Sequence, residues 1–441
     1  MATTQTPTIV NETTIVTVAP TPSQLQQSGA AVSAGGTTLA AGSYTYIAEE
    51  SQLAAILPST LTLDSLVWAS EVVTATAAAA IGVATGQTFT VEIAGAVPAD
   101  YNGTYTATIT GTDTFTFPLA TNPGTETSPG TYTAPYVGFL QNAATTFFAQ
   151  SNSSGSPIGF YVLELGPETT ASAAITALNA WIIANTPQQF YAYLVPASWD
   201  SVALDTMTSN YDSPSGQTYF FPTTTVANLS FYTSNKAVIA TVPSPTQAST
   251  EHQAAVPFYN WLVNNPSASN KLAPMAYRFA FGVTPWVQQG NATNFQNILT
   301  AFGNYIGTGA EGGISNACLF RGQTMDGSQS NWWYGVDWFR IQSKQALAAA
   351  VINGSNQNPP LEYDQPGINS LLAVLQGVAN SAVQFGCDLS VIVTAQSFAA
   401  YTTSNPDNYQ AGIYGGFAAT VVGQNGFLTL TFAIDAVQFV S

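Results

Sequence analysis

The spacing of apolar residues changes along this chain, and the change limits it to a fold built from several unlike parts. Between residues 71 and 135, apolar and polar residues alternate strictly, and turn signals such as Asn102-Gly103 separate the alternating runs. A period of two with glycine-containing turns is typical of antiparallel strands that bury one face. We therefore predict a small antiparallel β module over 71–135, inserted into a body whose first part is 36–70.

After residue 157 the pattern changes to short apolar runs that alternate with helical spacing. Strands that alternate with helices are typical of an α/β layer with parallel pairing. The fold class predicted for 136–300 is therefore α/β (α+β), with a mixed sheet. The predicted strands are 159–165, 190–195, 219–222 and 237–242, and the predicted helices are 169–185, 201–210 and 250–264.

Two helices with clear boundary signals mark the C-terminal region. The first is predicted to start with Asp337 as its N-cap. The second follows Pro366, and the acidic residues just before it, Glu362 and Asp364, favour a helix N-terminus. We expect 301–426 to form a separate C-terminal domain.

Both ends of the chain carry β-prone apolar residues in segments too short to bury them. We predict extended arms at 1–35 and 427–441. An unpaired apolar strand exposes a row of backbone donors and acceptors, so it aggregates unless another strand pairs with it. We therefore expect both arms to add strands to the sheets of neighbouring molecules. The residues assigned to this pairing are Ile9, Val10, Ile15, Val16, Val18, Leu428, Leu430, Phe432, Ile434, Val437 and Phe439.

Charged residues are scarce and unevenly placed. Only 7% of residues are charged, with 23 acidic and 6 basic side chains, and all the basic ones lie between Lys236 and Lys344. Binding to nucleic acid needs clustered Lys and Arg, so this distribution excludes that partner. Low charge suits a subunit that buries its surface against copies of itself, although a secreted or halotolerant protein could share it. We see no signal peptide and no bilayer-spanning apolar run, and expect no membrane partner.

Few residues could bind a metal or a cofactor. His252 is the only histidine, and we expect it to be exposed at the start of a helix. Cys318 and Cys387 lie in apolar runs, so buried free thiols are expected rather than a disulfide. Gly307 to Gly312 match the spacing of a dinucleotide fingerprint, but they follow a helix-like segment and precede a strand-like one, the reverse of what that motif needs. We predict no metal site and no cofactor.

Carboxylate pairs are the remaining route to catalysis. Glu362 with Asp364, or Asp326 with Asp337, would suit a glycosidase. Capping of the following helix explains the first pair more simply. The aromatic cluster around Trp332 could stack on sugars, but such rings more often pack in a core or an interface. We therefore predict no catalytic residue and no enzymatic activity.

Motifs in the last third of the chain resemble the C-terminal region of contractile bacteriophage tail sheath proteins. The resemblance covers about 130 residues well, and the α/β part only in outline. The motifs are Gly322-Gln323-Thr324-Met325-Asp326-Gly327, Gly335-Val336-Asp337-Trp338-Phe339, Pro360-Leu361-Glu362-Tyr363-Asp364-Gln365-Pro366-Gly367-Ile368 and Gly415-Gly416-Phe417 before an apolar terminal strand.

The resemblance implies a structural subunit that assembles in six-fold rings as a helical sleeve around a tail tube. Contraction of the sleeve would drive the tube into the host cell. Its partners would be copies of itself, the tail tube protein, and the baseplate and tail terminator proteins. The protein would be made in the host cytoplasm and would end in the virion tail. The region 71–135 would be a decoration module.

In that family the C-terminal region faces inward, toward the tube. Arg340 and Lys344 stand four residues apart on one side of a predicted helix, so they are candidates for facing an acidic tube surface. They could also pair with acidic residues of their own subunit.

Two other functions remain open at this point. A phage tail-fibre protein or surface adhesin would bind glycans through its aromatic residues and the β module, but the helical C-terminal region fits it poorly. A hydrolase would use one of the carboxylate pairs. Only a sheath subunit should form long hollow tubes unaided.

Overall fold

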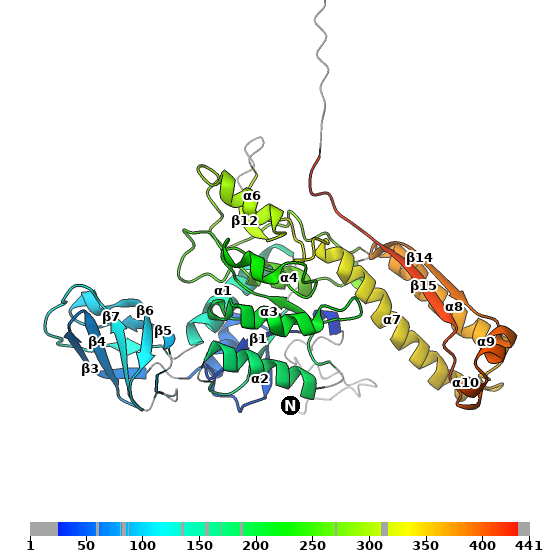
Figure 1. Ribbon diagram of the computed structural model, residues 1–441, viewed down its shortest axis with the longest axis horizontal. Helices are drawn as coiled ribbons and strands as arrows, with labels where there is room; N and C mark the ends of the chain where they lie inside the picture. Colours follow the sequence, from blue (N-terminus) through cyan, green and yellow to red (C-terminus); the bar gives the residue numbers. More distant parts are fainter. Residues whose placement is uncertain are drawn as a thin grey trace, which may run out of the picture.

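The computed structural model describes residues 25–430, except 59–60, 80, 82–84, 87, 134–135, 155–157, 169, 186–187, 270 and 310–315. Figure 1 shows three parts in a row: a β-barrel, an α/β body in the middle, and an elongated unit built on two long helices. The chain is a mixed α/β protein with several sheets, as predicted. The assigned arm residues from Ile9 to Val18 and from Phe432 to Phe439 lie outside the described residues.

The body is built on a five-stranded mixed sheet. Its strands are β1 (Gly29–Ser33), β2 (Tyr44–Ile47), β9 (Phe160–Glu164), β10 (Ala192–Leu194) and β11 (Tyr219–Phe221). Their order is β11-β10-β1-β9-β2, with parallel pairing throughout except between β2 and β9. All residues of the four parallel strands are buried, because helices cover both faces of the sheet.

Two pairs of helices cover these two faces. They are α1 (Val137–Ser154) with α4 (Ala255–Leu262), and α2 (Ala171–Ala184) with α3 (Val202–Thr208). Alternate strand residues point to opposite faces. Ala31 and Leu194 therefore pack with α1 and α4, whereas Ala30 and Tyr193 pack with α2 and α3.

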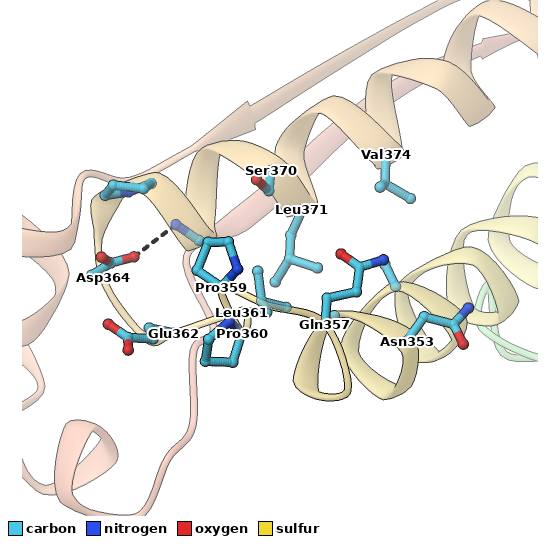
Figure 2. Close-up of a pocket in the computed structure, with 14 residues that line it drawn as sticks. Asn353, Gln357, Pro359, Pro360, Leu361, Glu362, Asp364, Ser370, Leu371 and Val374 are labelled. Atoms are coloured by element: carbon cyan, nitrogen blue, oxygen red, sulfur yellow. Dashed lines mark hydrogen bonds between the residues drawn. The ribbon is translucent and has the colours of Figure 1, made fainter.

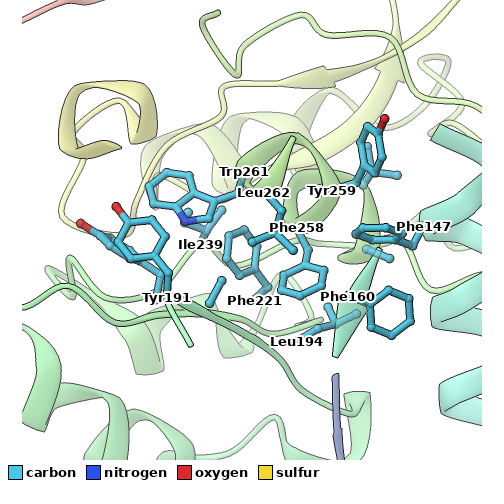
Figure 3. Packing of buried hydrophobic residues seen from close by; sticks show 14 of the residues in the cluster. Phe147, Phe160, Tyr191, Leu194, Phe221, Ile239, Phe258, Tyr259, Trp261 and Leu262 are labelled. Carbon is cyan, nitrogen blue, oxygen red and sulfur yellow. The ribbon is translucent and has the colours of Figure 1, made fainter. Parts of the chain in front are cut away.

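Aromatic rings dominate the core on the α1 and α4 side, as Figure 3 shows. Phe147 of α1 meets Phe160 of β9 and Phe258 of α4, with ring centroids 4.8 Å and 5.8 Å away. Tyr191 stacks on Trp261 with centroids 5.5 Å apart. Such pairs add about 0.5–1.5 kcal/mol each beyond the burial of their area. This core is continuous with buried residues of the C-terminal helices, among them Trp338 and Ala382.

The position of β1 corrects the N-terminal arm expected at 1–35. β1 lies inside the body sheet, and a Cβ added at Gly29 would stand 2.7 Å from the side chains of Leu262 and Phe258. A short strand buried on both faces shows no alternation, so its small residues resemble a linker in the sequence. The part of the predicted arm that remains ends before the described residues begin at Leu25.

The inserted module is a closed barrel of six antiparallel strands. They are β3 (Leu61–Ala69), β4 (Val72–Ala77), β5 (Thr88–Ala94), β6 (Gly103–Ile109), β7 (Thr114–Pro118) and β8 (Thr131–Tyr132), closed in the order β3-β4-β7-β6-β5-β8. The module starts at Leu61, earlier than the expected residue 71, because a register shift between Leu63 and Ser65 hides the alternation of β3. Leu61 pairs with Tyr132, so the chain enters and leaves the barrel at one place.

The rest of the body departs from the predicted elements in three places. Helix α1 was not predicted, because Thr, Asn and Gln among its apolar residues weaken the helical signal. Residues 237–242 form isolated bridges instead of a strand. The helix expected at 250–264 begins only at Ala255. The other elements of this region are α5 (Pro266–Ser269), α6 (Ala292–Thr300), β12 (Tyr305–Thr308) and β13 (Ala317–Phe320).

Short 3-10 helices complete the barrel and the body. They are η1 (Leu25–Gln27), η2 (Glu50–Ala55), η3 (Ala99–Tyr101), η4 (Ala197–Trp199), η5 (Ser209–Tyr211) and η6 (Asn228–Tyr232).

The elongated unit consists of α7 (Ser330–Ser355), α8 (Gln365–Gln384), β14 (Asp388–Ala395), α9 (Phe398–Ser404), α10 (Pro406–Gln410) and β15 (Phe417–Gly423). In Figure 1, α7 leads from the body to the far end of the unit, and α8 runs beside it. Helix α8 begins as predicted, since the Asp364 carboxylate accepts a hydrogen bond from the Gly367 N–H at 2.8 Å. Within the described chain, no helix has the length and hydrophobicity to cross a bilayer.

Helix α7 begins earlier than predicted. It starts at Ser330, so the assignment of Asp337 as its N-cap is wrong. Gly335, which looks like a helix breaker in the sequence, lies inside the helix where the chain packs tightly. A Cβ at this position would collide with the carbonyl oxygen of Cys387, just before β14.

Candidate assembly interface

The sheet of β14 and β15 has one packed face and one open face. Residues directly opposite each other in an antiparallel pair lie on the same face. Val391 and Val421 form such a pair and pack against the core. Ile392 and Val422 lie on the other face and are 63% and 45% exposed. The sheet therefore rests on α8 with one side and presents apolar side chains to solvent with the other.

Both outer edges of this sheet are open among the described residues. β14 pairs only with β15, and β15 only with β14. A register shift between Asp388 and Ser390 leaves Leu389 exposed at the start of β14. A two-stranded sheet is marginal by itself, and an open edge is a template for another strand. The arrangement can accept one strand on each side.

The segment that follows β15 is fastened to the body. Gln329 binds both backbone groups of Gly426: its Nε2 donates to the carbonyl at 2.9 Å and its Oε1 accepts from the N–H at 2.7 Å. The Tyr277 hydroxyl donates to the carbonyl of Leu428. The predicted C-terminal arm therefore leaves the body from a defined point.

Beyond this point the chain presents apolar side chains to solvent. Phe427 and Leu430 are 79% and 77% exposed. Residues 424–430 join none of the described sheets, so the strand expected from Leu428 and Leu430 is not completed within the described part of the molecule.

The N-terminal side of the described chain is also locked in place. Gln26 of η1 is buried, and its Nε2 donates to the carbonyl of Tyr334 in α7 at 2.9 Å. The Ser28 hydroxyl donates to the carbonyl of Leu25 at 2.6 Å. Residues before Leu25 thus leave from the place where α7 enters the body.

Asp337 joins α7 to the body sheet. Its Oδ2 accepts hydrogen bonds from the hydroxyls of Tyr191 at 2.9 Å and Tyr219 at 2.8 Å, and its Oδ1 forms an ion pair with Arg340 at 3.3 Å. The carboxylate is fully buried, and burial raises its pKa. Sequence reasoning missed this role, because an aspartate near a helix start is usually a cap.

A second buried charge stands beside Asp337. The Lys236 ammonium donates to the carbonyls of Ser213 at 3.0 Å and Gly216 at 2.6 Å, and it lies 4.3 Å from the ring centroid of Trp333. Burial lowers the pKa of Lys236, and the nearby Asp337 carboxylate opposes that shift. The tryptophan cluster thus packs against the body, as expected, and does not form an exposed stacking platform.

Arg340 and Lys344 share one side of α7 but have different environments. Besides its ion pair with Asp337, Arg340 donates to the carbonyls of Pro214 at 3.0 Å and Ser215 at 2.9 Å. Lys344 is exposed. Arg340 therefore pairs within its own subunit, whereas Lys344 is exposed and has no ion pair among the described residues.

The first candidate carboxylate pair lies at the tip of the unit. A groove of about 530 Å³ lies between α7, α8 and the loop that connects them, as Figure 2 shows. Asp364 at its rim caps α8, and Glu362 is exposed. The rest of the lining is mainly proline, leucine, alanine, valine and side-chain amides. The arrangement supports capping, as predicted.

The second carboxylate pair is also structural. Asp326 accepts hydrogen bonds from the Thr324 hydroxyl at 2.6 Å and the Ser328 N–H at 2.9 Å, which stabilise a turn. Asp337 anchors α7 as described above. Among the described residues, no group of three or more His, Cys, Asp or Glu side chains is placed to hold a metal ion.

His252 was expected to be exposed, and that prediction is wrong. Its side chain is buried against Phe139, with ring centroids 4.9 Å apart, and burial lowers its pKa to about 4. The backbone N–H of His252 donates to the Thr146 hydroxyl at 3.0 Å. The histidine is thus a neutral core residue at physiological pH. Cys318 and Cys387 are buried free thiols, as predicted.

The whole fold is similar to that of a solved protein chain. A chain of the anti-feeding prophage baseplate, solved by cryo-EM with 6-fold symmetry, matches with a TM-score of 0.54 and 12% identity. The match covers 98% of this chain and 100% of that chain. At this identity the match shows a shared fold alone.

Two crystal structures of sheath tail proteins match as well. The protein from Listeria innocua has a TM-score of 0.42 and 12% identity, covering 90% of this chain and 95% of that chain. The protein from Desulfitobacterium hafniense has a TM-score of 0.41 and 11% identity, covering 86% and 93%. No model of a known family and no curated protein sequence matches this chain. The structural matches over most of this chain thus include a baseplate chain and two sheath tail proteins, and at 11–12% identity they concern the fold alone.

Proposed function

We propose that this chain is the sheath subunit of a contractile tail. It polymerises in six-fold rings as a helical sleeve around the tail tube, and the sleeve contracts to drive the tube into the host cell. The role is structural, and the protein ends in the virion tail. The observation that carries this proposal is the sheet of β14 and β15, whose two edges are open among the described residues, in a chain that leaves the body from two anchored points.

Strand exchange between subunits would complete this sheet. One arm from each of two neighbours would turn two strands into four, and three or more strands on a helix make a sheet stable. The main-chain hydrogen bonds would supply affinity, and the alternating apolar side chains of the arms would set the register. The two arms and the two open edges match in number.

A short link joins the β-prone residues of the N-terminal arm to the anchored body. Its β-prone residues end at Val18, and the chain becomes anchored at Leu25. Seven residues span at most about 25 Å when extended. Pro20 and Pro22 within this stretch favour an extended backbone. An arm of this kind would extend from its own body to the β14–β15 sheet of an adjacent subunit.

Contraction would keep these links intact while the bodies move. The contracted state must then gain contacts between bodies that the extended state lacks. Charged residues make up only 7% of the chain, which would limit the repulsion between bodies that each have a net charge of -17. Proteins of the baseplate and the tail terminator would bind the two ends of the sleeve.

Lys344 is our candidate for contact with the tail tube. It is exposed on α7 of a chain with a net negative charge, whereas Arg340 is engaged within the subunit. The change Lys344→Glu should weaken assembly around the tube at low salt and leave assembly without the tube unchanged. Unaltered co-assembly with the tube would dismiss this contact. Reversing Arg340 as well would be less informative, because that change also breaks the Asp337 ion pair.

Electron microscopy of the purified full-length protein tests the proposal. We expect long hollow tubes. A protein lacking residues 1–20 should remain a folded monomer, because every described element begins after residue 24. Normal tubes from that protein would refute the N-terminal arm. An intact protein that stays monomeric or forms a compact trimer would favour an adhesin instead of a sheath.

A further inference from the structure

An exposed aromatic pair lies beside the point where the C-terminal arm leaves the body. Phe279 and Phe281 are 54% and 37% exposed, with ring centroids 6.3 Å apart. The segment that carries them is held firmly. The N–H of Phe281 donates to Gln150 Oε1 at 2.9 Å, and its carbonyl accepts from Gln150 Nε2 at 2.7 Å. We call Phe279 and Phe281 the aromatic ridge.

The ridge and the anchor of the arm are close together. Tyr277, two residues before Phe279, holds the carbonyl of Leu428 through its hydroxyl. A Cβ added at Gly426 would stand 2.7 Å from Pro274, so residues 426–428 run beside 274–277. The aromatic ridge therefore lies close to the start of the C-terminal arm of the same subunit, whichever molecule the arm binds.

The alternating segment assigned to the added strand starts at Leu428 itself. Even if pairing begins only at Ile434, the six residues after the anchored Leu428 span at most about 22 Å. The subunit that receives the arm therefore has its β14–β15 sheet within this distance of the donor's anchored residues. The short link places the donor's ridge next to the acceptor's sheet.

The open face of that sheet suits the ridge. Ile392 and Val422 are diagonal neighbours on this face, and Leu389 is exposed beside them. Neither strand carries a charged side chain between Leu389 and Ala395 or between Phe417 and Gly423. Around the ridge, Arg278 is turned inward and donates to the carbonyl of Asn260 at 3.0 Å. Contact would therefore bury apolar surface without the cost of desolvating a charge.

We propose that the aromatic ridge of one subunit docks on the open face of the β14–β15 sheet of the neighbour that receives its C-terminal arm. The occupant of that face is thus a second copy of this chain. This inference rests on the proposed function, because it requires the arm to bind another subunit. It adds a side-chain interface to the exchange of strands. The arm and the ridge of one subunit would then both bind the β14–β15 sheet of the same neighbour.

Cross-linking in assembled tubes tests the contact. Full-length Phe279→Cys and Ile392→Cys proteins would be mixed, assembled and treated with a short bismaleimide. The native cysteines are buried free thiols, which makes them poor competitors. We expect a cross-linked dimer at least tenfold stronger than in a matched mixture of Phe279→Cys with Val67→Cys, which places the second thiol on the exposed surface of the barrel.

The outcomes separate the inference from the function. Tubes without the specific cross-link would overturn the docking of the ridge and leave the sheath function standing. A parent protein that forms no tubes would overturn the function, and the ridge contact with it.

If the cysteine proteins do not assemble, alanine variants provide a second measurement. Phe279→Ala and Ile392→Ala should each raise the protein concentration needed for tubes severalfold. The double variant should lose little more than either single one, because residues in contact do not act independently. If the increases in the concentration needed for tubes multiply in the double variant, the two residues act independently and the proposed contact is wrong.

Discussion

The barrel and the β14–β15 sheet are built from similar sequences and differ in closure. Both are antiparallel, with alternating Val, Thr, Ala and aromatic residues. Each barrel strand has a partner on both sides, and its inward residues Val73, Val91 and Phe115 are completely buried. The β14–β15 sheet has two strands, and each has one partner among the described residues. Closure removes edges, and an open pair keeps them for another molecule.

This difference indicates where the molecule is self-sufficient. The barrel has its own core, and its ends meet where Leu61 pairs with Tyr132. The stability of the β14–β15 sheet depends on its packing against α8 and on the strands that pair with its edges. A surface module and an assembly module can thus be told apart by their edges, even where their sequence patterns agree.

The largest effect is expected when the C-terminal arm is removed. A protein lacking residues 431–441 should lose tube formation, because the open edge of the neighbour's sheet then has no strand to pair with. Its monomer should unfold at the same temperature as the parent. Excising the barrel (61–132) with a short linker is the matched control and should leave tubes. Electron microscopy reads both results, and tubes from the truncated protein would contradict the comparison.

The link between α7 and the body should show the next largest effect. Asp337→Ala leaves the hydroxyls of Tyr191 and Tyr219 without their acceptor and Arg340 without its counter-ion. Loss of one partner from a buried network costs about 3–5 kcal/mol in the free energy of unfolding. Urea denaturation measures this loss. Lys344→Ala on the same helix is the control and should change the free energy by less than about 0.5 kcal/mol; equal effects would refute the anchor.

A core change in the barrel should sharpen the comparison by remaining local. Leu66 is buried and its neighbour Val67 is exposed. Leu66→Ala should destabilise the barrel by about 2–5 kcal/mol, whereas Val67→Ala should cost less than about 0.5 kcal/mol. Hydrogen exchange of peptides from 61–132 measures the first effect. Tubes should still form in both cases, and loss of tubes from Leu66→Ala would show that assembly depends on the barrel.

The smallest expected effect is a pH dependence of stability that comes from Asp388 at the start of β14. Asp388 is buried, neither of its carboxylate oxygens accepts a hydrogen bond among the described residues, and burial raises its pKa to about 7. The unfolded chain has the ordinary pKa, near 3.8. Between these values the folded protein holds a proton that the unfolded chain releases. Stability should therefore decrease as pH rises from about 4 to about 7.

The control for this effect is Asp388→Asn, which removes the titrating group and keeps the shape. Unfolding of the parent and the variant would be measured by urea denaturation across this pH range. The slope of the parent should be more negative than that of the variant. Identical slopes would mean that Asp388 is paired and ionised in the folded protein.

Sequence reasoning was accurate where one local signal decides the structure. The Asp364 cap and Pro366 mark the start of α8, and apolar runs mark β9 and β10. It failed where a distant contact overrides the local signal. Asp337 lies inside α7, and the hydroxyls of the distant residues Tyr191 and Tyr219 satisfy its buried carboxylate. His252 is buried although its neighbours in the sequence are polar.

The sequence by itself determined the alternation of the barrel strands, the α/β pattern of the body, the lack of charge and the two β-prone ends. These are local properties, since each follows from the spacing and type of nearby residues. Only the tertiary structure decided that 61–132 closes into a barrel while β14 and β15 remain an open pair. It also decided that β1 belongs to the body, and that the ridge lies beside the anchored arm. Pairing between strands depends on contacts far apart in the chain, which the spacing of apolar residues does not encode.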